Sequence, residues 1–469
     1  MEPEHIRFGG GATETLLHPL VAVWMLIAIV LILTFPRKTA ITPFLLAVFT
    51  IPVGQVVVLG GLHFTVLRIL ILAGLARVAS FRVLSRGGKF PGGFNAVDQV
   101  VVLWTISALT ILSLQWMRMD ALIHNLGDFL DALGGYLVVR FLISDGEAIR
   151  RTFKVLAAIC AIQGACMINE QITHLNVFGY LGGTSLAVTV RDGVIRSGGV
   201  MGCIYAGVFA GVLIPLFLWL WTEGKSRMAA CAGLAGATAM VFASYASTSW
   251  MTYGASLAAL SFWHLRKQMR LVRWGLVAIL VGLHIVMHGP VWSLIEKIDL
   301  TGGSSSYHRY MLVDNCIRHF GDWWLLGSKN YPDWGFVMFD VCNQFILVAL
   351  RGGLVTLVIY IAIYKRSFEA IGEARKRVAG DRRQEWFLWC LGSALFATVV
   401  SSFGIYYIFY LMACLFCLLV GVSVATFEAR HVRVEALAKV QFESAPSAEG
   451  TYLPLNEARE GTWRGFFEA

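Results

Sequence analysis

Apolar segments about 20 residues long recur along almost the whole of this sequence, separated by polar connections. An α-helix rises about 1.5 Å per residue, so a segment of ~20 residues crosses the ~30 Å hydrocarbon core of a bilayer. Lipid offers the backbone no hydrogen-bond partners, and such segments must therefore be helical. The sequence predicts an all-α, polytopic membrane helix bundle of about thirteen transmembrane helices. We place them at 16–35, 40–58, 62–78, 99–115, 121–143, 151–169, 200–222, 227–246, 248–265, 271–289, 342–364, 386–403 and 405–427.

The composition excludes a water-soluble globular domain. Charged residues make up 14% of the chain, whereas about a quarter is usual in soluble domains, and the mean hydropathy is +0.68. A transmembrane β-barrel would show alternating segments of ~10 residues, which are not evident in the sequence. The net charge of +9 comes largely from cations in the connections, so it indicates a membrane orientation rather than binding to nucleic acid.

Lysine and arginine gather after every odd-numbered segment. Arg37 and Lys38 follow the first segment, and Arg266 and Lys267 follow the ninth. Because cytoplasmic connections are enriched in cations, the N-terminus is predicted outside and the C-terminus inside. The predicted divisions are a periplasmic tail at 1–15, a transmembrane domain at 16–427 with long periplasmic loops at 170–199 and 290–341, and a cytoplasmic tail at 428–469.

A few ionisable residues lie at membrane depth, where a charge costs about 2.5–3.5 kcal/mol on insertion scales. Arg68 lies near the outer end of the third segment. Three roles are open for it: its side chain extends to the water at the membrane surface, it binds a neighbouring helix, or it takes part in the function of the protein. His124, Asp128 and Asp131 share one face of the fifth segment. That face forms either an interhelical hydrogen-bond network or part of a solute path. Arg140, near the inner end of the same segment, is predicted to snorkel to water.

The first long loop ends in a stretch rich in arginine and glycine, at 191–202, which runs into the seventh segment. Arg191 and Arg196 both lie close to glycines. Glycine allows close approach of the backbone, and a guanidinium binds phosphate through two parallel hydrogen bonds. The N-terminus of a helix also favours an anion. The stretch is therefore a candidate phosphate site, although loops carry arginine and glycine for other reasons as well.

The second long loop is predicted to be partly helical. Apolar residues at helical spacing indicate a helix over 307–320, capped by the serines at 304–306. His308 and Arg309 lie in its first turn. Aromatic residues further along, such as Trp334, either stack on sugar rings or anchor the loop at the membrane interface.

Segments in both loops carry a resemblance to a known family. The first loop contains Arg196-Ser-Gly-Gly-Val-Met-Gly, with Gly207 eleven positions after the arginine. The second contains His308-Arg309, then Trp-Trp-Leu-Leu-Gly at 323–327, then Asp340-x-x-Asn343 followed by Gly-Gly-Leu at 352–354. These resemble the Arg-x-x-Gly and Arg-x10-Gly stretches, the loop arginine, the Leu-x-Gly and the Asp-x-His-Asn…Gly-Gly-Leu of the bacterial O-antigen ligase and O-antigen polymerase superfamily. The resemblance covers roughly residues 40–420.

The resemblance implies an inverting, metal-independent glycosyltransferase of the bacterial inner membrane, with no cofactor. Its donor would be a glycan on a polyprenyl pyrophosphate, and its acceptor a hydroxyl of a glycan or glycolipid. The product would be a surface polysaccharide or exopolysaccharide. Membrane lipids and other polysaccharide-assembly proteins would be its further partners, and nucleic acid would not.

Four arginines at the outer boundary of the membrane are candidates for binding the pyrophosphate. In this hypothesis Arg196 and Arg309 hold it directly, and Arg68 or Arg191 supports them.

Several residues are candidates for the general base, because one position departs from the family pattern. The family's loop histidine is replaced by Cys342, and a thiol with a pKa of ~8.5 is a poor base at neutral pH. Either His308, Asp340 or His319 substitutes for it, or a pyrophosphate held by arginines leaves so readily that little base catalysis is needed. His308 or Asp340 is the predicted base or acceptor-orienting group, and Asn343 is predicted to position the loop.

Two other classes of function stay open at this point. A transporter or flippase for a lipid-linked or anionic solute would use Arg68 and the face of the fifth segment as its path. A membrane assembly protein without catalysis would tolerate the cysteine at position 342.

Overall fold

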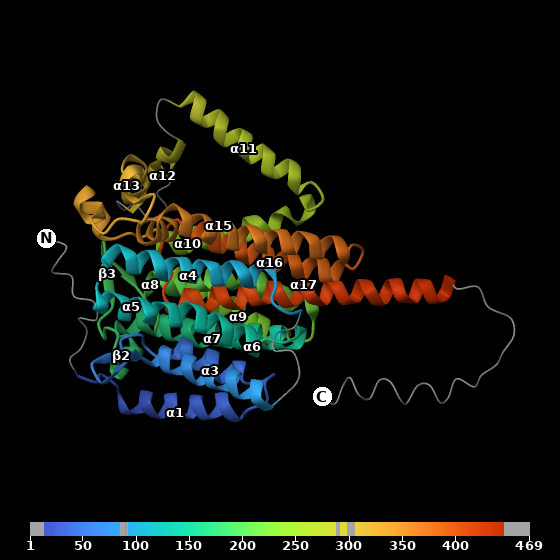
Figure 1. Ribbon diagram of the computed structural model, residues 1–469, viewed down its shortest axis with the longest axis horizontal. Helices are drawn as coiled ribbons and strands as arrows, with labels where there is room; N and C mark the ends of the chain where they lie inside the picture. The colour runs from blue at the N-terminus through green and yellow to red at the C-terminus, as the bar shows by residue number, and fades with distance from the viewer. Residues whose placement is uncertain (1–13, 85–89, 91, 288–290, 298–304, 445–469) are drawn as a thin grey trace.

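The computed structural model describes residues 14–84, 90, 92–287, 291–297 and 305–444, and most of these are helical (Figure 1). The predicted all-α class is confirmed, with two antiparallel hairpins as the sheets of the described chain. The helices up to residue 244 are α1 (Pro19–Thr34), α2 (Ile41–Thr50), α3 (Val66–Leu84), α4 (Ala96–Trp116), α5 (Met119–Phe129), the π-helix η2 (Leu130–Gly134), α6 (Gly135–Leu142), α7 (Gly146–Thr173), the 3-10 helix η3 (Val177–Leu181), α8 (Cys203–Glu223) and α9 (Arg227–Ser244).

The second half of the chain continues in the same way. Its helices are α10 (Ser247–Ser261), η4 (Phe262–Leu265), α11 (Met269–Val286), η5 (Val291–Ser293), α12 (Leu294–Lys297), α13 (Ser305–Arg318), α14 (Phe320–Trp323), η6 (Tyr331–Trp334), η7 (Phe336–Phe339), α15 (Gln344–Arg377), α16 (Arg382–Ser401) and α17 (Phe409–Ser444). The hairpins are β1 (Val56–Leu59) with β2 (Leu62–Thr65), and β3 (Thr189–Arg191) with β4 (Val194–Arg196).

Seven of the described helices are long and apolar enough to cross a membrane: α4, α7, α8, α9, α11, α15 and the first part of α17. The helices α1 and α2 are apolar but shorter, with 16 and 10 residues. Each predicted apolar segment contains a helix. The helix α13 lies where a helix was predicted in the second long loop, although part of its predicted serine cap lies outside the described residues.

The second predicted segment, 40–58, is wrong in length. Its helix α2 ends at Thr50, and Ile51 is already extended with ψ 126°. Pro52 explains this end, because a proline disfavours the helical conformation of the residue before it and has no N–H of its own. The β-branched residues that follow form the hairpin β1–β2 instead.

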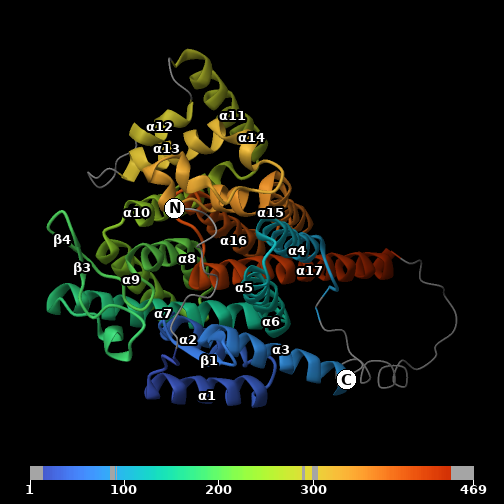
Figure 2. The ribbon, with the colours of Figure 1, turned by 60° about the vertical axis from the view of Figure 1, so that its left-hand side comes forward.

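The helix α8 lies within the bundle, in contact with α7, α9, α10, α16 and α17 (Figure 2). Small residues allow close approach of its neighbours α7 and α9. A Cβ atom placed on Gly236 of α9 would lie 2.4 Å from the carbonyl oxygen of Cys160 in α7. Helices in lipid gain stability from such close backbone contact.

The β3–β4 hairpin of the first long loop and the helices α12 and α13 of the second lie at the same end of the bundle (Figure 1).

A break in α15 receives the second long loop. Gly353 has φ 66° and ψ −175°, which interrupts the helix. The loop segment at 323–328 packs there, because Ser328 N–H donates to Leu350 O and Leu354 N–H donates to Trp324 O, each at 2.8 Å. The two stretches with family-like motifs, 323–327 and 352–354, therefore bind each other.

We expect Gly353→Ala to destabilise the protein by at least about 1–3 kcal/mol, because its backbone conformation is one that glycine alone adopts easily. In addition, a Cβ there would lie 2.5 Å from Leu325 O. The measurement is the thermal unfolding midpoint in detergent. Gly372→Ala is the matched control on the same helix, since its Cβ would meet nothing within 4 Å. Equal midpoints for the two variants would contradict this account of the break.

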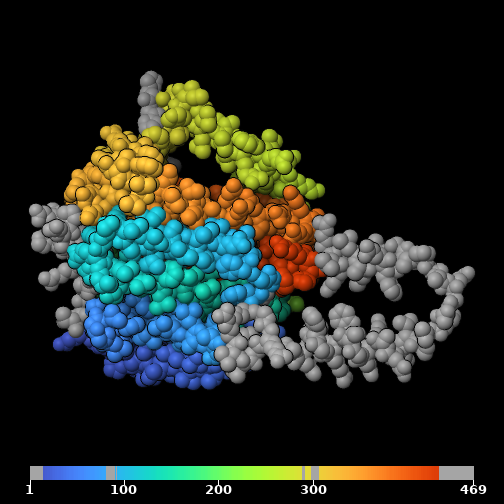
Figure 3. Space-filling model, in the orientation of Figure 1, coloured from blue at the N-terminus to red at the C-terminus, as the bar shows by residue number. Residues whose placement is uncertain are grey.

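The helix α11 stands away from the rest of the molecule, with open space beneath it (Figure 3). None of its residues is buried, and it is apolar over most of its surface. A helix that is apolar on all sides suits an environment of lipid.

Candidate functional site

The junction between α9 and α10 receives the Arg309 side chain from the second long loop. Arg309 lies in α13, and its Nη2 donates to Ser247 Oγ at 2.8 Å and to Thr248 Oγ1 at 2.9 Å. Both hydroxyl residues are buried. The two hydrogen bonds therefore set the direction of the guanidinium.

Arg196 approaches the same junction from the first long loop. It ends β4, and the next residue, Ser197, donates its N–H to Ala243 O at the end of α9 at 2.9 Å. The Arg196 Nε is buried and has no hydrogen-bond partner among the described residues. The Arg309 side chain and the backbone next to Arg196, from the two separate loops, thus both contact residues 243–248.

The glycines after Arg196 already bind an anion of the protein itself. Gly198 N–H lies 3.0 Å and 3.2 Å from the two carboxylate oxygens of Glu170, and Gly199 N–H lies 3.0 Å from one of them. Gly199 has φ +54°, a conformation that glycine adopts without strain. The backbone predicted to cradle a phosphate is therefore occupied, and the Arg196 side chain is the group of this motif that a ligand can use.

Arg191 lies at the tip of the β3–β4 hairpin. It pairs with Val194 across the hairpin, and Asp192 and Gly193, with φ 51° and 76°, form the two-residue turn. Its half-exposed side chain lies 3.6 Å from the Asp192 carboxylate. The described contacts hold Arg191 at the hairpin tip rather than at the α9–α10 junction.

His308 is held by a backbone carbonyl. Its Nε2 lies 2.8 Å from Asp340 O. A carbonyl oxygen accepts hydrogen bonds and cannot donate them, so Nε2 carries the proton and a neutral His308 has its lone pair on Nδ1. The contact uses the main chain of Asp340, not the carboxylate. His308 therefore has the tautomer of a base that works through Nδ1.

Cys342 lies between Asp340 and the start of α15. Burial raises the pKa of its thiol to about 11, the Asp340 charge acts in the same direction, and the Arg309 charge lowers the pKa. The thiol is protonated at neutral pH. A buried, protonated thiol does not suit Cys342 to the role of a general base.

Asn343 caps α15. Its Oδ1 accepts hydrogen bonds from Phe345 N–H at 3.0 Å and Ile346 N–H at 3.2 Å, and the residue is 2% exposed. Gln344 then accepts a hydrogen bond on Oε1 from Tyr407 N–H at 2.7 Å. The side chain of Asn343 is used in holding the end of the loop against α15, which is the geometry that a positioning role requires.

Arg68 pairs with the acidic face of the predicted fifth segment. Its Nη2 and Nε lie 2.7 Å and 3.0 Å from the Asp131 carboxylate, and its Nη1 donates to His63 O at 3.1 Å. His124 and Asp128 lie 3.8 Å apart on the same helix face. Arg68 and Asp131 therefore form an interhelical pair, whereas the contact of His124 with Asp128 lies within one helix.

A cavity of ≈260 Å³ lies between this acidic face and the start of α15. Most of its lining is apolar, from α3, α4, α15 and α17. Its polar lining includes Asn125, Asp128, Asp131, Gln344 and Arg351. A largely apolar cavity with a few polar groups suits a ligand that has an apolar chain and a polar end.

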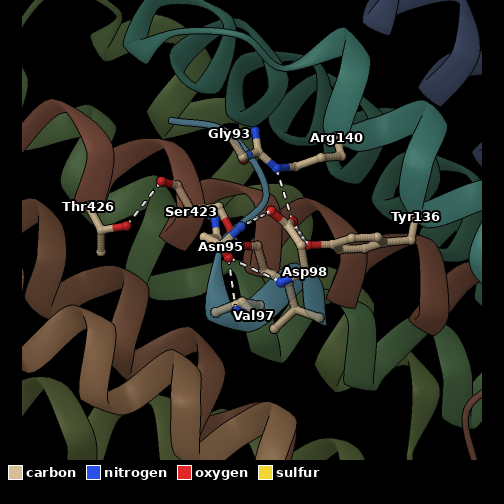
Figure 4. Close-up of polar contacts among 9 residues, drawn as sticks. Gly93, Asn95, Val97, Asp98, Tyr136, Arg140, Ser423 and Thr426 are labelled. Carbon is tan, nitrogen blue, oxygen red and sulfur yellow. Dashed lines mark hydrogen bonds and ion pairs between the residues drawn. The ribbon is translucent and has the colours of Figure 1, made fainter. Parts of the chain in front are cut away.

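The prediction that Arg140 snorkels is wrong, because the residue is 1% exposed. Figure 4 shows its partners: Nε donates to Asp98 Oδ1 at 3.1 Å, and Nη2 donates to Gly93 O at 3.2 Å. Tyr136 donates its hydroxyl to the same Asp98 oxygen at 2.5 Å, and the other carboxylate oxygen accepts Asn95 N–H in a capping box. Arg140 thus forms a buried ion pair with Asp98, which joins α6 to α4.

His319, the remaining base candidate, lies just after α13. Its Nδ1 is 2.9 Å from Asp322 Oδ2, and its ring stacks on Trp334 with centroids 4.5 Å apart. One face of the Trp334 ring, which was predicted to stack on a sugar or to anchor the loop, therefore stacks on this imidazole.

The residues that bind the Arg309 side chain were not predicted from the sequence. Ser247 and Thr248 lie within a run of three hydroxyl residues, 247–249, at the start of the predicted segment 248–265. Such a run at the edge of the membrane was a signal for polar contacts. Arg351, which lines the cavity, was missed because it stands in a segment read only for its apolar length.

A comparison with models of protein families found no match, and a comparison with curated proteins also found none.

Proposed function

We propose that this chain is a membrane glycosyltransferase of the O-antigen ligase or polymerase type, which transfers a glycan from a polyprenyl pyrophosphate to a hydroxyl of a glycan or glycolipid. The observation that carries the proposal is that the Arg309 side chain and the backbone next to Arg196, from two separate loops, both contact the α9–α10 junction. A departing pyrophosphate needs cations placed around it in advance, and arginine suits this task through paired hydrogen bonds.

The nearby cavity supports a donor that is attached to a lipid. Gln344 lines the cavity and follows directly after Cys342 and Asn343 in the chain. Asp340 and Arg309 both act electrostatically on Cys342. The apolar cavity and Arg309 therefore adjoin at the start of α15, as a lipid chain and its pyrophosphate require.

In the proposed reaction, an acceptor oxygen forms a bond to the anomeric carbon of the donor while the bond from this carbon to the pyrophosphate oxygen breaks. Arg196 and Arg309 stabilise the negative charge of the departing pyrophosphate. His308, protonated on Nε2, accepts the proton of the acceptor hydroxyl on Nδ1. Asp340 positions His308 through its carbonyl oxygen.

The proposal includes the full predicted topology in a bacterial inner membrane. The chain crosses the membrane about thirteen times, with the N-terminus outside, both long loops in the periplasm and the C-terminal tail in the cytoplasm. The shared position of both loops at one end of the bundle supports this arrangement (Figure 1).

Deletion of the gene, followed by gel analysis of surface, secreted and lipid-linked polysaccharides, tests the function. Loss of long chains with accumulation of single lipid-linked units is expected for a polymerase. Full-length chains that stay on the lipid carrier are expected for a ligase. Unchanged glycans in all three fractions would contradict the enzyme and leave transport of a lipid-linked or anionic solute as the function to test.

A further inference from the structure

A second and larger cavity, of ≈1050 Å³, lies at the opposite end of the bundle. The start of α7, the end of α8, the start of α16 and the middle of α17 form its walls. The other ends of α7 and α8 lead into the first long loop and towards Arg196. This cavity is therefore separate from the proposed catalytic site.

The acidic residues of the cavity already have partners. Arg150 forms hydrogen-bonded ion pairs with Glu147 and Glu223. Glu428 accepts the N–H of Gly146 at 2.6 Å, which caps the start of α7. These contacts occupy the carboxylates along one wall and build that wall from three helices.

Three further cations line the cavity and are not used in this way. Lys225, Arg382 and Arg383 are exposed, and among the described residues their side chains make no hydrogen bond or ion pair. The cavity thus presents three exposed cations beside a wall in which Arg150 pairs with two of the carboxylates and a backbone N–H binds the third.

Aromatic side chains form the deeper lining. Trp263 and Trp386 meet edge to face with ring centroids 5.0 Å apart, and Trp386 Nε1 donates to Thr222 Oγ1 at 2.9 Å. Trp219 and Phe387 continue this lining, with centroids 4.4 Å apart. Tryptophan beside cations at a helix end is typical of the boundary between lipid and water.

We propose that this cavity binds the phosphate headgroup of an anionic phospholipid. Arg382, Arg383 and Lys225 bind the phosphate, and the tryptophans contact the glycerol backbone and the first carbons of the acyl chains. Basic pockets between transmembrane helices bind such headgroups on the cytoplasmic side, where this end of the bundle is predicted to lie. The aromatic lining favours a lipid over a soluble phosphate compound, which would gain nothing from it.

Native mass spectrometry of the full-length protein, titrated with phosphatidylglycerol in detergent, tests the proposal. The variant R382A/R383A is expected to bind the lipid roughly tenfold more weakly or worse, since losing one charge-assisted hydrogen bond is enough for that factor. The matched control K365A/K376A removes two cations of α15 that do not line the cavity, and it should bind within about twofold of the native protein. Phosphatidylcholine should bind the native protein more weakly than phosphatidylglycerol.

Equal weakening in the two double variants would overturn the proposal, because it would assign the effect to general surface charge. Competition by millimolar inorganic phosphate that displaces the lipid from the native protein would overturn the lipid as the ligand. Thermal unfolding of each variant checks that it is folded. If R382A/R383A is unstable, the single variant Trp386→Phe takes its place, and unchanged binding of phosphatidylglycerol there would count against the site.

Discussion

Replacing Arg309 with alanine is expected to lower the rate of glycan transfer from a lipid-linked donor by about a hundred- to a thousandfold, the usual cost of removing one pre-oriented group that stabilises developing charge. Ser247 and Thr248 hold this guanidinium at 2.8 Å and 2.9 Å, so its direction is set before the substrate binds. The measurement is the initial rate of transfer in proteoliposomes that contain the purified full-length protein and the lipid-linked glycan.

Two control variants make the result specific. Arg191→Ala removes an exposed arginine at the tip of the β3–β4 hairpin and should change the rate by less than about threefold, because its contact is with the neighbouring Asp192. Arg309→Lys keeps the charge but not the planar fork, and it should recover only part of the rate. A rate for Arg309→Ala close to that of Arg191→Ala would contradict a role for Arg309 at the pyrophosphate.

Replacing Asp98 with alanine is expected to destabilise the protein by about 3–5 kcal/mol, the usual result of removing one partner of a buried ion pair. Arg140 would stay buried with its charge uncompensated, and Tyr136 would lose the acceptor of its hydroxyl. The cap of α4, in which Asp98 accepts Asn95 N–H, would be lost as well. Thermal unfolding in detergent or nanodiscs measures the effect.

The double variant Asp98→Leu/Arg140→Met tests the cause of this loss. It removes both charges, and it should be more stable than Asp98→Ala because no charge is left buried and unpaired. Glu369→Ala serves as a control, since it breaks an exposed pair with Arg366 and should shift stability by less than about 1 kcal/mol. A melting temperature for Asp98→Ala that matches Glu369→Ala would contradict the role assigned to the buried pair.

Local sequence patterns were enough to locate the helices. The apolar lengths that predict membrane helices are properties of short segments, and each predicted segment contains a helix. The early end of α2 was also readable, because Pro52 lies inside the segment that was predicted to run to residue 58. The effect of Pro52 on the residue before it depends on the local sequence and not on tertiary packing.

Pairings between distant residues could not be predicted in the same way. Arg140 and Asp98 are 42 residues apart, and only the packing of α6 on α4 brings them together. A charge near a helix end snorkels unless a buried partner is in reach, and the sequence does not say whether one is. Arg68 was singled out as a charge in an apolar segment, but its pairing with Asp131 also depended on packing.

The candidate site also combines features that local sequence predicts with contacts that depend on packing. Arg196 and Arg309 were selected for their chemistry and their loops, and the structure brings the Arg309 side chain and the backbone next to Arg196 to residues 243–248. The role of the glycines after Arg196 could not be read from the motif, because Glu170 competes for the same N–H groups from another helix. A glycine-rich turn binds whichever anion the fold brings to it.

Binding of undecaprenyl pyrophosphate to the purified full-length protein tests the central claim most directly, because it isolates the arginines from the acceptor and from the base. The native protein should bind the pyrophosphate lipid more tightly than the corresponding monophosphate. The double variant Arg196→Gln/Arg309→Gln should lose about a hundredfold in affinity or more, while Arg191→Gln should stay close to native. Equal affinity in the native protein and the double variant would contradict the claim that these two arginines hold the pyrophosphate.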